Sequence, residues 1–272
     1  MKFIIKLVLT IIFIPVFLIF ILAINLRFQI LAPSFWEKVF ISGDVYTKLS
    51  TSINENLESE AVIEGGKPGD VNILTDLISP ENLQDAINKN INNFLEYANG
   101  KTGEIVVYIP VSKIPKAFLS TSFNTVKEQM SLSDLIKEFN ISGISAAQIQ
   151  MISHLGEAAW LILLFSASLV VLILCLLYLC VSPGKRLVAP GLALILSGLT
   201  ELSIYFMGTF VGSNFAGNLV GISNVGDSLI GIIVPPILKG LFNLWLPNAI
   251  GAIVFGTVLL FIKKSGYIRK PK

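Results

Sequence analysis

Charged residues and cysteines are scarce in this 272-residue sequence. Only 14% of the residues are charged, whereas 53% are hydrophobic, and the mean hydropathy is +0.75. Soluble domains rarely reach such values, so the sequence belongs to the class of integral membrane proteins. The two cysteines, Cys175 and Cys180, share one apolar stretch, and His154 is the single histidine. These counts exclude a disulfide framework and the ligand set of a structural zinc site.

Recognisable catalytic motifs are also missing. The sequence contains no H-E-x-x-H, G-x-S-x-G or C-x-x-C motif and no pair of acidic residues within one apolar stretch. The glycine-rich residues 64–70 lack the spacing of a phosphate-binding loop and follow no predicted strand. We therefore expect a protein that is not an enzyme and that binds no cofactor and no metal, and nothing in the sequence indicates a nucleic acid partner.

Four apolar stretches are long enough to cross a bilayer. They are residues 3–26, 160–181, 187–210 and 241–262, and each can supply the ~20 helical residues that the hydrocarbon core requires. The first stretch is interpreted as a retained anchor and not as a signal peptide, because its apolar run is too long for one and no A-x-A cleavage site follows it.

Basic residues sort to one side of this arrangement. The short turn at residues 182–186 marks the cytoplasmic side, because basic residues in short loops stay inside. Both termini then also lie inside, and the bilayer is predicted to be the bacterial cell (inner) membrane. Nine basic residues and no acidic residue fall on that side, namely Lys2, Lys6, Lys185, Arg186, Lys263, Lys264, Arg269, Lys270 and Lys272.

The predicted fold is that of an all-α integral membrane protein, with four transmembrane helices and a mainly helical, minor β extracytoplasmic domain between helices 1 and 2. Residues 1–26 form the anchor and residues 27–155 the extracytoplasmic domain. Residues 156–272 form a three-helix transmembrane region. In this region, residues 211–240 are an extracytoplasmic loop with short helices on the outer leaflet, and residues 263–272 are a basic tail.

Apolar spacing and capping residues predict the helices of the outer domain. Residues 36–57 read as one amphipathic helix or as two helices joined near Gly43. Ser79 is the expected N-cap of a helix that ends at Asn99 and Gly100. Residues 113–130 are expected to be helical, and Ser131 to cap a short helix ending at Phe139. Residues 144–155 are expected to continue without a break into the second span.

One strand is predicted in the outer domain, at residues 104–111, where β-branched residues and a tyrosine follow one another. A single strand needs a partner. The two candidates are residues 61–74 and the same strand of a second copy, and an unpaired edge would offer a docking place.

Glu201 is the one acidic residue deep in a predicted span. Ser197 and Tyr205 lie one helical turn before and after it, on a stripe that begins with Ala189 and Ala193. A charged carboxylate facing lipid would cost ~3 kcal/mol, so the side chain should face the helix bundle. These three residues are the candidate functional residues. Glu201 is interpreted either as a proton or cation site or as a structural hydrogen bond between helices.

Several short patterns resemble four-pass bacterial membrane proteins that have a large first outer loop and no assigned activity. They are Phe35 and Trp36 with Val45 and Tyr46 after the first span, residues 79–84 opening a helix, and residues 95–100 before a strand that ends near Pro110. The resemblance covers roughly the first half of the chain. It implies the fold described above and supplies no catalytic residue.

Two functions follow as hypotheses. The first is a non-enzymatic polytopic membrane protein whose outer domain interacts with a membrane or envelope protein, another copy or an envelope component. The second is an oligomeric ion, proton or small-solute channel or transport subunit that uses Glu201. The lipid bilayer is the one partner common to both.

Overall fold

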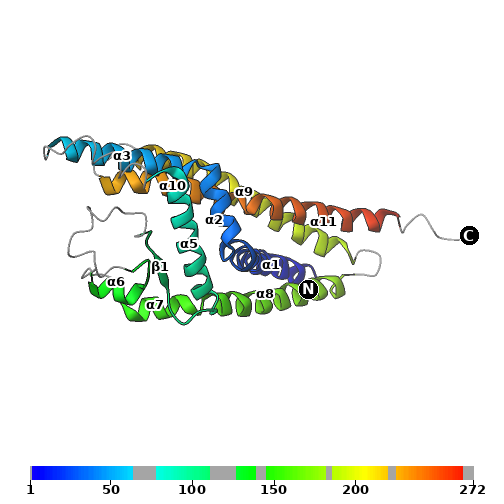
Figure 1. Cartoon of the computed structure of the whole chain (residues 1–272). Helices are drawn as coiled ribbons and strands as arrows, with labels where there is room; N and C mark the ends of the chain where they lie inside the picture. The colour runs from blue at the N-terminus through cyan, green and yellow to red at the C-terminus, as the bar shows by residue number, and fades with distance from the viewer. Residues whose placement is uncertain are drawn as a thin grey trace, which may run out of the picture. The chain divides into compact units, whose positions relative to one another are not determined.

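The computed structural model describes residues 2–63, 78–110, 127–138, 145–181, 186–219 and 225–265. These residues are mostly helical (Figure 1). Four segments among them are long and apolar enough to cross a membrane: Ile4–Ile30, Leu155–Leu179, Val188–Val211 and Leu229–Ile262. The expectation of a largely helical multi-pass membrane protein with four spans is therefore confirmed at this level.

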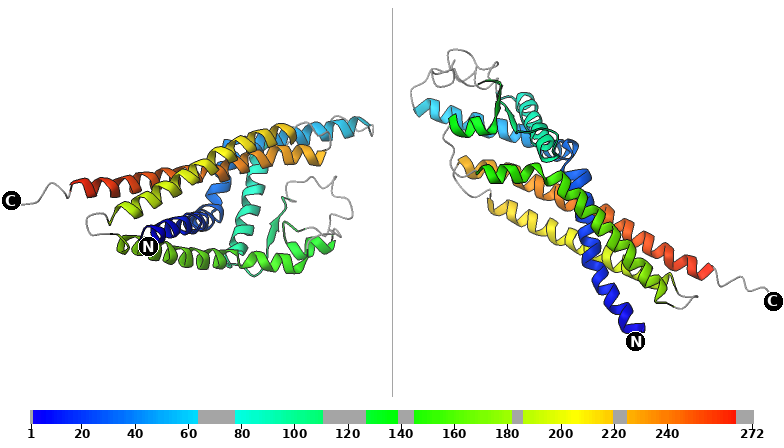
Figure 2. Two further views of the ribbon diagram at one scale, coloured as in Figure 1. Left: turned by 180° about the vertical axis from the view of Figure 1, so that it is seen from behind. Right: turned by 90° about the horizontal axis from the view of Figure 1, so that it is seen from below.

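The chain divides into two compact units. Unit 1 comprises residues 1–28, 158–214 and 238–272, and unit 2 comprises residues 29–157 and 215–237. The helices that contribute to unit 1 are α1 (Lys2–Asn25) with the π-helical turn η1 (Leu26–Ile30), α8 (Leu155–Leu179), α9 (Val188–Leu219), the end of α10 (Val225–Asn243) and α11 (Trp245–Ser265). Figure 2 shows α9 and α11 running alongside one another.

A single apolar core holds the helices of unit 1 together. Its buried members come from all four helices: Phe13, Phe17, Ile21, Val170, Ile173, Leu177, Ala193, Leu194 and Ala252. Helices α9 and α11 approach each other closely at two glycines. A Cβ on Gly191 would lie 2.8 Å from the carbonyl oxygen of Gly256, and one on Gly256 would lie 2.6 Å from that of Gly191. Small residues of this kind let membrane helices pack backbone against backbone.

Unit 2 is built around a second core. Helices α2 (Pro33–Ser42) and α3 (Val45–Ile63) supply its buried residues, namely Val39, Phe40, Val45, Tyr46 and Leu49. The side chains of Leu229, Ile232, Ile233 and Ile237 pack against them from α10 (Val225–Asn243). Residues far apart in the sequence therefore complete one core.

The break between α2 and α3 lies at Gly43, as one of the two sequence-based alternatives predicted. Asp44 follows with a φ of 53°, and a Cβ on Gly43 would lie 2.5 Å from the ring of Pro236. Just beyond the break, the hydroxyl of Tyr46 donates a 2.7 Å hydrogen bond to Asn88. Burial, with the negative charge of Glu37 adding to it, raises the pKa of Tyr46, so this hydroxyl remains a donor at neutral pH.

Helix α5 (Pro80–Ala98) begins and ends where its capping residues predict. The Ser79 hydroxyl accepts a hydrogen bond from the backbone of Asn82, and Gly100 follows Asn99 with a φ of 70°. Two shorter helices, α6 (Leu132–Glu138) and α7 (Ala146–Ser153), belong to the same unit. The hydroxyl of Ser131 caps α6 through the backbone of Asp134, so the predicted cap is also confirmed, whereas the predicted end at Phe139 lies outside the described residues.

The predicted strand pairs with a segment that was predicted to be helical. Strand β1 (Val106–Tyr108) is antiparallel to β2 (Gln129–Ser131), with Val107 opposite Met130. The expected partners, residues 61–74 or a second copy, are therefore wrong for this edge, and Ala61 to Ile63 belong to α3. The helix expected over 113–130 is wrong at residues 127–130, none of which is helical, and the prediction for 113–126 lies outside the described residues.

Asparagine side chains from α5 seal the other edge of β1. Asn90 accepts a 2.7 Å hydrogen bond from the backbone N–H of Tyr108 and donates a 2.9 Å bond to its carbonyl oxygen. Asn93 donates a 2.8 Å bond to the carbonyl of Val106. Figures 1 and 2 show β1 lying beside α5. The strand therefore offers no open edge over Val106–Tyr108, contrary to the docking hypothesis.

Three helix boundaries differ from expectation. A turn at His154 separates α7 from α8, so the continuous helix predicted over 144–155 and into the span is wrong there. Helix α9 extends beyond Phe210 to Leu219, because no proline stops it. Helix α10 continues through Pro235 and Pro236 to Asn243, past residue 240, where the extracytoplasmic loop was expected to end. The glycine-rich residues 64–70, most of the turn at 182–186 and the tail from 266 onward lie outside the described residues.

Candidate functional site

Two of the three predicted site residues lie in the interior of unit 1. Ser197 and Glu201 are both 0% exposed, and Ala193, one turn earlier on α9, is buried in the core of the unit. Tyr205 is only half-buried, and its ring contacts that of Phe206, with centroids 5.3 Å apart. The structure therefore groups Ser197 with Glu201 inside the bundle and places Tyr205 at its margin.

Within the part of the chain that the structure describes, these two side chains have no hydrogen-bond partner. This holds for the hydroxyl of Ser197 and for both carboxyl oxygens of Glu201. Hydroxyls on helices usually bond to the carbonyl four residues earlier, as Thr200 does to Leu196 at 2.9 Å. Ser197 does not, so its hydroxyl remains available inside the bundle, one turn from a carboxyl group.

A hydrogen-bonded asparagine pair lies at the same level of the bundle. Asn248 on α11 donates to the side-chain oxygen of Asn25 on α1 at 3.1 Å. The level follows from two close approaches of α9: the Cβ position of Gly198 lies 2.8 Å from the carbonyl oxygen of Ala249 on α11, and that of Gly208 touches Phe242 at the end of α10. Glu201 lies between these two contacts along α9, and Asn248 lies between them along the other segment.

We call Asn25, Ser197, Glu201 and Asn248 the polar layer. It draws on α1, α9 and α11, and Asn25, Ser197 and Glu201 are almost completely buried. A buried polar group without a partner costs ~1–3 kcal/mol, and a charged carboxylate at such a depth costs more. Chemically, the layer can hold a neutral carboxyl group or exchange a proton. It can also place a carboxyl group, a hydroxyl group and two side-chain amides around a small polar ligand.

The acidic composition of unit 1 limits what else the polar layer can do. Glu201 is the only Asp or Glu in the sequence of this unit. No group of three or more His, Cys, Asp or Glu side chains is placed to hold a metal ion anywhere in the described ranges. A proton or a single-charge cation therefore fits the layer better than a divalent metal, which prefers several carboxylates.

Sequence reasoning missed Asn25 and Asn248. Asn25 lies at the end of the stretch 3–26, where an asparagine can equally mark the end of a span, and Asn248 is an isolated polar residue seven positions inside the stretch 241–262. The pairing of the two became visible only when α1 and α11 were placed side by side, so spacing along the sequence carried no signal for it.

The chain was also compared with known proteins. No family model, no curated protein and no solved structure matches it. The geometry described above is therefore the basis for the functional conclusions that follow.

Proposed function

We propose that this chain is a non-enzymatic multi-pass protein of the bacterial cytoplasmic membrane whose outer domain binds another protein or an envelope component. In this proposal both termini lie in the cytoplasm and residues 27–155 lie outside it. The resemblance to four-pass bacterial proteins with a large first outer loop agrees with this arrangement. The lipid bilayer surrounds unit 1, and unit 2 is the part available for binding.

The core of unit 2 is the observation that carries the proposal. It joins α2 and α3, which follow the first span, to residues 229–237, which begin the fourth candidate span. In a four-span protein, the segment between spans one and two and the segment between spans three and four lie on the same side of the membrane. Both segments can therefore contribute to one water-exposed domain. The crossing part of the last span would then be α11, with the first half of α10 in the outer domain.

Charge supports the same division. Every acidic residue of the sequence except Glu201 lies in unit 2, whereas unit 1 carries the nine basic residues assigned to the cytoplasm. Basic residues in short loops stay in the cytoplasm. Unit 2 also has the capped helices and the sealed strand of a domain that is folded in water. A folded, acidic, water-exposed unit on a membrane bundle is suited to binding partners.

Orientation is tested by labelling intact cells with a membrane-impermeant maleimide. Both native cysteines, Cys175 and Cys180, are first replaced by serine. Glu96→Cys places a thiol on an exposed position of α5, and Lys6→Cys places one at the start of α1. We expect labelling of the first variant in intact cells and of the second only after the cells are opened. The reverse pattern would refute the proposed topology.

Binding is tested by native mass spectrometry of the full chain, extracted from its own membrane in mild detergent. The expected result is a stoichiometric second component, which is lost when charges on the exposed surface of α5 are reversed, as in Glu96→Lys. A closed ring made only of identical copies would contradict the proposal.

The second candidate function is an oligomeric channel or transport subunit based on Glu201. The observation in its favour is the carboxyl group without a partner within the described residues. Against a pore between copies stands the burial of Glu201 and Ser197 by helices of their own chain. This candidate function is tested by measuring proton or ion flux in liposomes that contain the Glu201→Gln variant. If the flux equals that of the parent chain, the channel or transport function based on Glu201 is refuted.

A further inference from the structure

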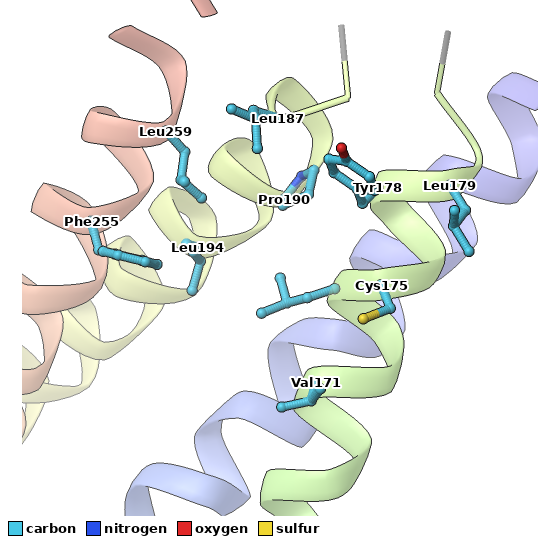
Figure 3. Close-up of a pocket in the computed structure, with 10 residues that line it drawn as sticks. Val171, Cys175, Tyr178, Leu179, Leu187, Pro190, Leu194, Phe255 and Leu259 are labelled. Atoms are coloured by element: carbon cyan, nitrogen blue, oxygen red, sulfur yellow. The ribbon is translucent and has the colours of Figure 1, made fainter. Parts of the chain in front are cut away.

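An apolar groove opens along one side of unit 1, between α8 and the pair α9 and α11. Its volume is about 380 Å³. We call it the acyl groove. Its lining includes Val171, Cys175 and Tyr178 of α8, Pro190 and Leu194 of α9, and Phe255 of α11. Figure 3 shows Tyr178 directed from α8 toward Pro190 across one end of the groove.

The groove is open toward the surroundings of the bundle and closed toward its core. Val171 and Phe255 are 60% and 58% exposed, whereas Leu194 at the inner wall is 4% exposed. Along α8 it extends from Val171 to Leu179, a rise of about 12 Å. One leaflet of a bilayer has about 15 Å of hydrocarbon, half of its ~30 Å core. The groove therefore matches one leaflet in depth.

A cation marks the end of the groove. The guanidinium of Arg186 lies 5.4 Å from the ring centroid of Tyr178, and the next residue, Leu187, lines the groove. The Nε of Arg186 is buried and has no hydrogen-bond partner among the residues that the structure describes. A buried donor normally has an acceptor, and the guanidinium group of arginine matches the geometry of phosphate oxygens while it can also stack on an aromatic ring.

No carboxylate of unit 1 is available to supply that acceptor. Its one acidic residue, Glu201, lies about 20 Å along α9 from Val188, the first residue of the helix. Because no residue that the structure describes accepts a hydrogen bond from the Arg186 Nε, an anion from outside the chain would complement it. In a membrane, the anion found at the end of a leaflet-deep apolar groove is the phosphate of a lipid.

We propose that the acyl groove binds an anionic phospholipid, with one acyl chain between α8 and the α9–α11 pair and its phosphate at Arg186. If the orientation given under the proposed function is correct, this lipid lies in the cytoplasmic leaflet. Lipid binding itself does not depend on that orientation. The lipid fills an apolar surface within one leaflet and supplies the acceptor for the arginine Nε. Neither a helix of a second copy nor an apolar peptide would supply that acceptor.

The proposal is tested by native mass spectrometry of the full chain in detergent, with phosphatidylglycerol or phosphatidylcholine of identical acyl chains added. One phosphatidylglycerol should be retained with a preference of roughly fivefold over phosphatidylcholine, as expected for one arginine near the lipid surface. Arg186→Gln should abolish the preference. Lys239→Gln, which removes an exposed positive charge of unit 1 far along the sequence from the groove, should leave it unchanged.

A second variant tests the position of the acyl chain. Val171→Trp places a large side chain at an exposed position of the groove wall, and it should lower retention of both lipids while the protein remains folded by thermal unfolding. Equal retention of both lipids by the parent chain, or an unchanged preference in Arg186→Gln, would overturn the proposal. So would full retention in Val171→Trp, or a second copy of the chain in place of the lipid. None of these outcomes bears on the partner of unit 2, so the two proposals fail separately.

Discussion

Replacing Asn90 should selectively loosen strand β1. Its side chain bonds to both backbone groups of Tyr108 at 2.7 and 2.9 Å, and Tyr108 itself is only 9% exposed. In Asn90→Ala both bonds are lost, and the N–H and C=O of Tyr108 remain without partners. At a net ~1 kcal/mol for each bond, the local free energy of opening should fall by about 2 kcal/mol. The adjacent bond from Asn93 to Val106 should weaken with it.

Hydrogen exchange of the full-length protein, followed by mass spectrometry on peptides that cover β1, measures this change. A loss of about 2 kcal/mol corresponds to roughly 30-fold faster exchange. Asn90→Asp should exchange at least as fast, because a carboxylate oxygen would then face the carbonyl oxygen of Tyr108. The matched control is Asn92→Ala on the exposed side of α5. If Asn90→Ala and Asn92→Ala exchange at the same rate over β1, then Asn90 does not hold the strand.

Three further substitutions have defined expectations. Gly191→Ala should lower the thermal unfolding temperature, because overpacking against Gly256 costs ~1–3 kcal/mol of stability. The control is Gly251→Ala, whose Cβ meets nothing within 4 Å, and it should be neutral or slightly stabilising in the same thermal unfolding experiment. Ser79→Ala should cost ~1 kcal/mol in a chemical denaturation of unit 2 through loss of the α5 N-cap, and a Gly substitution there should cost less. Glu201→Met should raise the unfolding temperature in detergent, because it removes a buried carboxyl group that has no partner in the described structure. A lower unfolding temperature would indicate that this carboxyl group is bound to another group.

The sequence predicted the features that depend on local chemistry. Span lengths follow from uninterrupted apolar residues, and the ends of α5 follow from Ser79 at its start and from Asn99 and Gly100 at its end. The break at Gly43 was predicted as one of two alternatives. In each case the residues that decide the structure lie within a few positions of the feature itself, so a pattern along the chain is sufficient.

Features that depend on distant partners escaped the same reasoning. Residues 129–131 carry no strand pattern and become β2 only because β1 is beside them. Pro236 lies within α10, where its ring lies against a residue without a side chain, Gly43. The inward stripe of Ser197 and Glu201 was foreseen, but its asparagine neighbours from α1 and α11 were not, because their pairing spans more than two hundred residues.

The discontinuous core of unit 2 has a consequence for biosynthesis. When the ribosome has completed α2 and α3, their apolar faces lack the isoleucines of α10, and α8 and α9 must be made before those isoleucines exist. The nascent chain therefore carries an incomplete domain through the insertion of two further membrane helices. A product that ends before Val225 would retain both of those helices and yet expose the faces around Val39 and Phe40. A truncated chain would therefore differ from the complete one by the unfinished core of unit 2.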